Sequence, residues 1–125
     1  MPLRIVYIDD ESDLCQVFID NFSSDEIQIR TFIDPVEAVR FMTNDLPDLM
    51  FIDYRLPGTT GIEIAKLIAS SVAKVLISGD LGLKSSPEFV KIMGKPFNFQ
   101  EVEGLIQGYV DKKKLLHLEG VIPST

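Results

Sequence analysis

The stretch "FIDYRLPG" (residues 51–58) places a carboxylate, Asp53, directly after an apolar run. Pro57 and Gly58 follow shortly, and both residue types favour a turn. A sequence that is typical of a buried strand therefore ends on a charged side chain, and the chain then leaves the strand at once. This arrangement indicates that Asp53 is a candidate functional residue, held at the end of the strand.

Five short apolar runs recur along the chain, at residues 3–8, 27–32, 48–53, 73–78 and 89–93. The first, third and fourth runs are nearly continuous, which is typical of strands buried on both faces of a parallel sheet. The second run, "IQIRTF", alternates more and predicts an edge strand. Because helical patterns fill the gaps, the chain predicts right-handed crossovers and a three-layer α/β sandwich.

The helical patterns differ in quality along the chain. Apolar positions repeat at three- and four-residue steps in the first two helices, at Leu14, Val17, Phe18 and Phe22 and at Val36, Val39 and Met42. Capping boxes predict three helix starts, at Asp34 with Glu37, Thr60 with Glu63 and Asn98 with Glu101. The segment "DLGLKSSPE" (80–88) instead predicts a short or irregular fourth helix, because glycine, serine and proline are poor helix formers.

The composition indicates one globular domain. The 125 residues are 46% hydrophobic and 25% charged, which is typical of a globular chain. The 12 basic and 19 acidic residues give a net charge of −7, so we expect no direct binding of nucleic acid by this domain. No apolar run approaches the roughly 20 residues of a spanning helix. The start lacks a signal peptide and Cys15 is the single cysteine, so we expect a cytoplasmic location without membrane contact.

Polar residues follow four of the five predicted strands: Asp9 and Asp10, Asp53, Ser78 and Lys95. In open α/β sheets, sites form beyond the carboxyl ends of the strands. Three aspartates at one edge repel each other, and Mg²⁺, which prefers oxygen ligands, relieves that repulsion. A lysine and a serine hydroxyl can both contact a phosphoryl oxygen. Together these groups predict the transfer of a phosphoryl group onto a carboxylate.

On these residues the chain resembles a response-regulator receiver domain of two-component signalling, over nearly its whole length. The matching features are Asp9-Asp10, Asp53 in "DYRLPG", Ser78 and Lys95-Pro96. The resemblance implies a flavodoxin-like, doubly wound parallel sheet of five strands in the order 2-1-3-4-5, with the Lys95–Pro96 bond in the cis form. It places a receiver domain at 1–111, and leaves 112–125 as a C-terminal helical extension or the start of a linker.

The resemblance also implies a Mg²⁺ site. Asp10 and Asp53 are expected to bind the ion directly, together with the backbone carbonyl of Arg55. Asp9 is expected to act through a water molecule.

The same resemblance makes Asp53 the phosphoacceptor. A histidine kinase or a histidine phosphotransfer protein is the expected donor, Ser78 is expected to bind the phosphoryl group and Lys95 to pair with it. Only autophosphorylation and autodephosphorylation are expected, so the chain is not predicted to be an enzyme with an external substrate. Output is expected through the face of the fourth helix, fifth strand and last helix, which is also a candidate homodimer interface. That face is predicted to be atypical, because Ile92 stands where the family usually has an aromatic residue.

Other functions remain as alternatives. The first is a phosphorylation-independent pseudo-receiver that acts as a protein-interaction module. An aspartyl phosphatase similar to haloacid dehalogenases needs a carboxylate two residues after its nucleophile, where this chain has Arg55. A flavin- or nucleotide-binding module needs a glycine-rich loop after the first strand, where this chain has "IDDESD". A separate hypothesis pairs Arg55 with Asp80 across the site to slow hydrolysis, the simpler alternative being two independent exposed charges.

Overall fold

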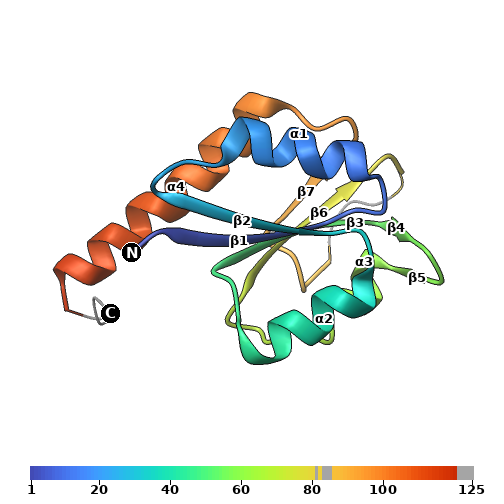
Figure 1. The fold of residues 1–125 in the computed structure, drawn as a ribbon, viewed down its shortest axis with the longest axis horizontal. Helices are drawn as coiled ribbons and strands as arrows, with labels where there is room; N and C mark the ends of the chain where they lie inside the picture. Colours follow the sequence, from blue (N-terminus) through green and yellow to red (C-terminus); the bar gives the residue numbers. More distant parts are fainter. Residues whose placement is uncertain (81, 83–85, 121–125) are drawn as a thin grey trace.

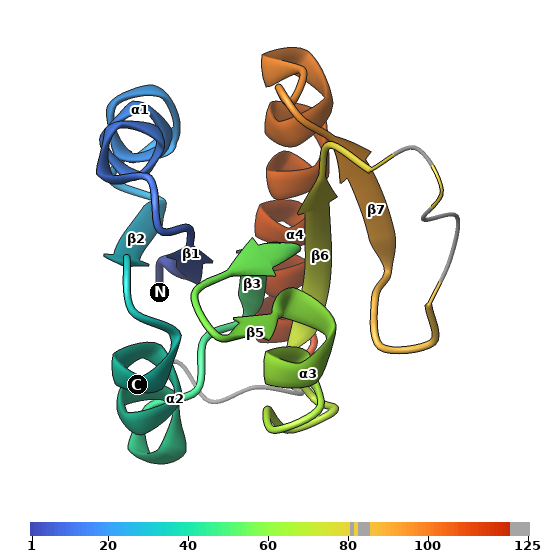
Figure 2. The same ribbon diagram turned by 90° about the vertical axis from the view of Figure 1, so that its right-hand side faces the viewer.

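The computed structural model describes residues 1–80, 82 and 86–120 of the 125. Its central sheet consists of five parallel strands: β1 (Leu3–Ile8), β2 (Ile27–Phe32), β3 (Leu49–Asp53), β6 (Ala73–Ser78) and β7 (Lys91–Gly94). They lie in the order β2-β1-β3-β6-β7 (the sheet is nearly edge-on in Figure 1, and Figure 2 shows the order), which is 2-1-3-4-5 when these strands alone are counted. The predicted doubly wound, flavodoxin-like sheet is therefore confirmed, with β2 at an edge.

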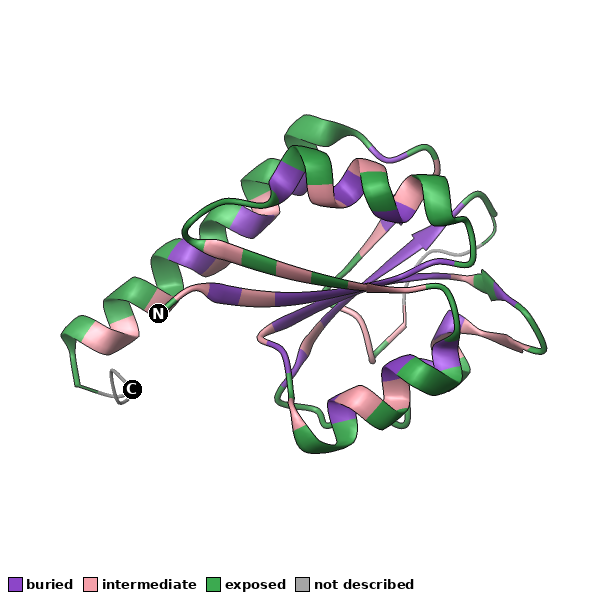
Figure 3. Ribbon diagram, viewed as in Figure 1, coloured by how far each residue is buried: buried purple, intermediate pink, exposed green. Residues whose placement is uncertain are grey.

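Helices cover both faces of the sheet. The helices α1 (Ser12–Phe22) and α4 (Phe99–Leu118) lie on one face, and α2 (Pro35–Asn44) and α3 (Gly61–Ala65) lie on the other (Figures 1 and 2). Side chains alternate between the faces of a strand, so Phe51 packs in the core under α1 and α4 whereas Ile52 packs under α2 and α3. The central strands are almost wholly buried (Figure 3), as their continuous apolar runs predict.

All three predicted helix caps are present. Side-chain oxygens of Asp34, Thr60 and Asn98 accept hydrogen bonds from the backbone N–H groups of the first helical turns, at 2.9, 3.3 and 3.0 Å respectively. Each bond satisfies a donor that has no partner within its own helix. The cap at Thr60 matters for the site, because it fixes where the chain re-enters a helix after β3.

The apolar face of α2 differs from the predicted one. In α1 the predicted Phe18 and Phe22 are buried beside Cys15, and Leu14 and Val17 are partly buried. In α2 the buried residues are Pro35, Ala38 and Met42, whereas Val36 is 53% exposed. Ala38 and Met42 are fully buried in the core with β1 and β3, so they mark the face of α2 that meets the sheet, and Val39 packs at its margin.

The chain between β6 and β7 contains no helix in its described residues, which are 79–80, 82 and 86–90. The part of the predicted fourth helix at residues 81 and 83–85 lies outside the described residues. The fifth strand of the sheet begins at Lys91 rather than at the predicted residue 89. Ile92 is partly buried against the core under α2 and α3.

The last helix, α4, continues without a break past residue 111 to Leu118. Lys113 lies on this helix, and its ammonium group donates to Asp48 Oδ2 at 2.7 Å and to the carbonyl oxygen of Pro2 at 3.0 Å. Lys113 thus ties α4 to the amino end of the sheet. Throughout the part of the chain that the structure describes, no helix has the length and apolar character required to cross a bilayer.

Candidate functional site

A tight turn after β3 holds Asp53 at the edge of the sheet. The next residue, Tyr54, donates its backbone N–H to the carbonyl oxygen of Ile77 at 2.8 Å, so pairing with β6 continues past Asp53. The chain then forms a short hairpin, β4 (Arg55–Leu56) and β5 (Thr59–Thr60). Gly58 turns it with a φ of +74°, a conformation that glycine adopts without steric cost.

Gly61 brings the returning chain directly under Asp53. Its backbone N–H donates to the carbonyl oxygen of Tyr54 at 2.8 Å. A Cβ atom at position 61 would lie 2.5 Å from the carbonyl oxygen of Asp53 and 3.0 Å from Leu76 Cδ1. The backbone of residue 61 therefore packs directly against the backbone of Asp53, and this close contact requires a residue without a side chain.

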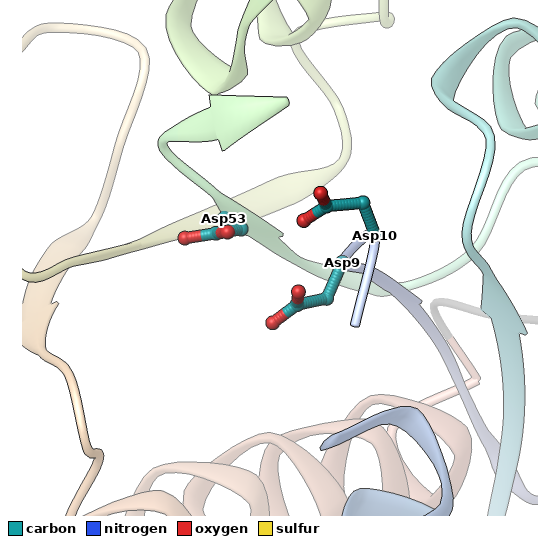
Figure 4. Close-up of side chains that lie close together, drawn as sticks. All are labelled: Asp9, Asp10 and Asp53. Atoms are coloured by element: carbon teal, nitrogen blue, oxygen red, sulfur yellow. The ribbon is translucent and has the colours of Figure 1, made fainter. Parts of the chain in front are cut away.

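Three aspartates meet at the carboxyl ends of β1 and β3. One carboxylate oxygen from each of Asp9, Asp10 and Asp53 lies within 4.8 Å of those from the other two, and their carboxyl groups turn to the same side (Figure 4). Asp9 is fully buried and Asp53 is 5% exposed, whereas Asp10 is exposed. The three carboxylates thus meet at one edge, as their positions at the strand ends predict, with two of them inside the protein and one open to solvent.

Lys95 joins this cluster from the end of β7. Its Nζ atom lies 3.2 Å from Asp53 Oδ2, 3.4 Å from Asp9 Oδ2 and 3.0 Å from Glu11 Oε1. The Lys95–Pro96 bond is cis, as expected. Burial alone would lower the pKa of Lys95, but the hydrogen bond with Glu11 and the charges of the two aspartates outweigh it and raise that pKa. Lys95 is therefore a permanent cation shared by three carboxylates.

The environment of Asp53 disfavours its charged form. Burial raises the pKa of Asp53 and the nearby charge of Asp9 raises it further, while the contact with Lys95 acts in the opposite direction. The net shift is upward from the ordinary value of 3.8. A cation at the site would relieve this cost, so the site favours the binding of further positive charge.

Asp9 is held by three donors. Its Oδ1 accepts from the backbone N–H of Glu11 at 3.0 Å, and its Oδ2 accepts from the hydroxyl of Tyr7 at 3.1 Å and from Lys95. Burial, followed by the charge of Asp9, raises the pKa of Tyr7, so Tyr7 remains a neutral donor. With both oxygens engaged, Asp9 fits the indirect role that the resemblance implies for it.

An open cleft of about 390 Å³ lies above these groups. Its lining includes Asp10, Asp53, Ser78 and Lys95. Ser78 Oγ accepts a hydrogen bond from the backbone N–H of Asp80 at 2.9 Å, which leaves its own proton available to a ligand. Larger clefts occur elsewhere, but among the described residues this one borders the single candidate metal-binding group.

Arg55 and Asp80 line the same cleft but form no ion pair with each other within the described chain. The guanidinium of Arg55 lies 5.9 Å from the ring centroid of Tyr54. A carboxylate oxygen of Asp80 instead accepts from the backbone N–H of Gly82 at 2.9 Å. The hypothesis of a paired gate is therefore not supported by this conformation, and the simpler reading of two independent charges fits better.

The groups present fit Mg²⁺. The donor set consists of carboxylate oxygens, which this hard cation prefers. The exposed Asp10 accepts no hydrogen bond from any residue in the described part of the chain. Asp10 and Asp53 would hold the ion directly and Asp9 would act behind them, with the backbone carbonyl of Arg55 as the further predicted ligand.

Two residues of the site were not assigned a role from the sequence. Glu11 pairs with Lys95, and Tyr7 binds Asp9. The signal for Tyr7 was available, since a residue two positions before Asp9 leaves the strand on the same face. Glu11 also follows the first strand, but its position alone does not show that its side chain reaches Lys95, since that contact depends on two long side chains.

Comparison with known proteins agrees with this geometry. The family model for the response regulator receiver domain matches residues 5–82, which is more than half of the chain. The chain belongs to this family. Receiver domains are the phosphorylation-based switches of two-component signalling.

Relatives of this receiver domain are similar over most of its length. Sporulation initiation phosphotransferase F of Bacillus subtilis is 25% identical over 121 residues, which cover 90% of this chain and 98% of the relative. The alkaline phosphatase synthesis transcriptional regulatory protein PhoP of Bacillus subtilis is 24% identical, covering 92% of this chain. The matched part of this chain spans about half of PhoP, 51% of its length.

Solved structures share the fold. A response regulator receiver domain protein from Clostridium thermocellum has a TM-score of 0.78 at 25% identity, covering 90% of this chain and 98% of that one. The response regulator TrrA from Thermotoga maritima, solved in complex with Mg²⁺ and BeF, has a TM-score of 0.76 at 23% identity, with 86% and 98% covered.

Proposed function

We propose that this receiver domain accepts a phosphoryl group on Asp53, in a Mg²⁺-dependent reaction with a phosphorylated histidine of a partner kinase or phosphotransfer protein. The observation that carries the proposal is the position of Lys95 Nζ, 3.2 Å from Asp53 Oδ2 and beside two further carboxylates. Lys95 supplies the positive charge that favours the ionised form of this nearly buried carboxylate, which borders an open cleft. Membership of the receiver family supports it.

The transfer uses groups that are already in place. An oxygen of Asp53 forms a bond to the donor phosphorus while the bond from phosphorus to the donor nitrogen breaks. The donor imidazole leaves in its neutral form, and any proton that its ring lacks comes from solvent. A bound Mg²⁺ would supply charge neutralisation for the phosphoryl oxygens. Lys95 can exchange its contact with Asp53 Oδ2 for a phosphoryl oxygen, and the Ser78 hydroxyl can donate to another.

Release of the phosphoryl group completes the cycle without an external substrate. Attack of water on phosphorus regenerates the carboxylate of Asp53 and liberates inorganic phosphate. The chain thus acts as a switch with autophosphorylation and autodephosphorylation, in the cytoplasm. Phosphorylation replaces the carboxylate charge of Asp53 with a phosphoryl group that carries about −1.5 to −2 charges and three acceptor oxygens. This moves Lys95 and Ser78 toward the new group and changes the adjoining surface.

We place the output at β7, α4 and the described residues that precede β7. Lys95 leaves β7 directly, and Ile92 on that strand is only partly buried. A shift of Lys95 is therefore transmitted to the surface formed by β7, α4 and the residues that precede β7. Residues 79–80, 82 and 86–90 of the connection between β6 and β7 form no helix there. A downstream protein, an output domain or a second copy of the chain are the candidate partners there.

Intact mass spectrometry tests the proposal. The chain is incubated with Mg²⁺ and a small-molecule phosphodonor, in parallel with Asp53→Asn. Wild type is expected to gain one phosphoryl group, and the variant none. Failure of the folded wild type to gain it with several donors would favour the alternative, a phosphorylation-independent interaction module.

A further inference from the structure

Tyr7 connects the hydrophobic core to the acidic site. It is fully buried in β1, and its ring stacks on Phe18 with the centroids 4.3 Å apart and an interplanar angle of 23°. Its hydroxyl donates to Asp9 Oδ2 at 3.1 Å. The ring is thus fixed by packing, and its one polar atom points at a carboxylate of the site.

We propose that Tyr7 is a positioning residue, whose hydroxyl holds the Asp9 carboxylate in the orientation from which Asp9 serves Lys95 and a bound divalent cation. The inference rests on the proposed function and extends it to a residue that lines neither the cleft nor the group of three aspartates.

The geometry separates two rigid donors from one mobile donor. The backbone N–H of Glu11 fixes Oδ1 of Asp9, and Tyr7 fixes Oδ2. Lys95 also reaches Oδ2, but at the longer distance of 3.4 Å and from a flexible side chain. The two rigid donors therefore determine the rotation of the carboxylate, while Lys95 is free to move.

This separation matters when a phosphoryl group forms on Asp53. Lys95 is then drawn to the new oxygens, and Asp9 loses its cationic partner. A fully buried carboxylate without donors is strongly unfavourable. Tyr7 leaves Oδ2 with a hydrogen bond in both states, so Asp9 keeps its orientation while Lys95 changes partners.

Tyr7→Phe tests the role, because it removes the hydroxyl and keeps the stacked ring. Loss of an outer partner of a metal site typically weakens metal affinity about 10- to 100-fold. We expect the dissociation constant for Mg²⁺, measured by calorimetry, to rise about tenfold, and phosphorylation at subsaturating Mg²⁺ to slow. The matched control is Tyr109→Phe on α4, a partly buried tyrosine outside the site, which should leave both values unchanged.

The contrary result is equally clear. If Tyr7→Phe binds Mg²⁺ within twofold of wild type and is phosphorylated at the same rate, Tyr7 is a packing residue and the inference fails. The proposed function is unaffected by that result, since it depends on wild type binding Mg²⁺ and gaining a phosphoryl group.

A spectroscopic measurement keeps the test decisive if Tyr7→Phe does not fold. The chain has three tyrosines and no tryptophan. In the double variant Tyr54→Phe/Tyr109→Phe, Tyr7 is the one remaining tyrosine, so a tyrosine hydroxyl proton detected by NMR belongs to it. A hydroxyl held by Asp9 is expected to give a slowly exchanging proton signal both without and with Mg²⁺. Absence of that signal in either state, while calorimetry records Mg²⁺ binding, would overturn the inference.

Discussion

The ammonium group of Lys95 lies 3.2 Å from Oδ2 of Asp53, although the two residues are 42 positions apart in the chain, with β6 and β7 between them. Both follow strands of the same parallel sheet, and the edge where those strands end brings them together. Asp53 is nearly buried, so this contact offsets part of the cost of its charge. The same contact gives phosphorylation a cation to displace.

A change at Gly61 should disturb Asp53 through the backbone. In Gly61→Ala the new Cβ atom would meet the carbonyl oxygen of Asp53 at 2.5 Å. We expect a loss of about 1–3 kcal/mol in the free energy of unfolding, measured with urea, and slower phosphorylation of the folded fraction.

The control for Gly61→Ala is Gly104→Ala in α4, where an added Cβ meets nothing within 4 Å. This variant should gain about 0.5–1 kcal/mol, because alanine is the better helix residue. Equal stability of Gly61→Ala and wild type would show that the turn beneath Asp53 adapts without strain.

Asp53→Asn should stabilise the fold near neutral pH when no divalent cation is present. The pKa of Asp53 in the folded chain is raised above 3.8, so the folded state binds this proton more tightly than the unfolded state. The stability linked to that proton is present below pH 3.8 and is lost as the pH rises through the folded pKa. Asparagine stays neutral throughout, so its urea midpoint should exceed that of wild type at pH 7, and the difference should shrink toward pH 4. A variant that is less stable than wild type at pH 7 would contradict the assigned direction of the shift.

Mg²⁺ should raise the thermal stability of wild type. At a concentration one hundred times the dissociation constant, binding to the folded state contributes about 2.7 kcal/mol. Asp10→Asn should lose most of this effect, because Asp10 is the exposed carboxylate of the cluster. Asp13→Asn, a change in the first turn of α1, is the matched control and should respond to Mg²⁺ like wild type. Equal responses from both variants would remove Asp10 from the metal site.

Arg55 and Asp80 should influence the phosphate lifetime independently. They line one cleft without forming an ion pair in the described chain. In a double-mutant cycle of Arg55→Ala and Asp80→Ala, each substitution changes the activation free energy of dephosphorylation. The two changes should add in the double variant to within about 0.5 kcal/mol. A larger coupling would restore the paired gate as a feature of the phosphorylated form.

Backbone geometry explains why most of the site could be predicted. Asp9, Asp10, Asp53 and Ser78 adjoin strand ends that apolar runs reveal, and parallel strands bring those ends to one edge. Lys95 follows the same rule at β7. These positions depend on the order of elements and are insensitive to side-chain detail.

Details that depend on packing were not predictable from the sequence. The face of α2 that meets the sheet carries Ala38 and Met42, and the valine pattern did not indicate Ala38. The ties of Lys95 to Glu11 and of Lys113 to Asp48 join residues far apart in the chain through long side chains. The boundary between 1–111 and 112–125 stays a prediction, although α4 itself runs through it.

The central claim is that Asp53 itself carries the phosphoryl group, and its location can be measured chemically. Hydride reduction of an aspartyl phosphate gives homoserine and releases phosphate, so the modified position is found by peptide mass spectrometry. After incubation with Mg²⁺ and a phosphodonor, we predict homoserine at position 53 and at no other aspartate. Homoserine at another aspartate, or its absence from a wild-type chain that has bound Mg²⁺, would contradict the account.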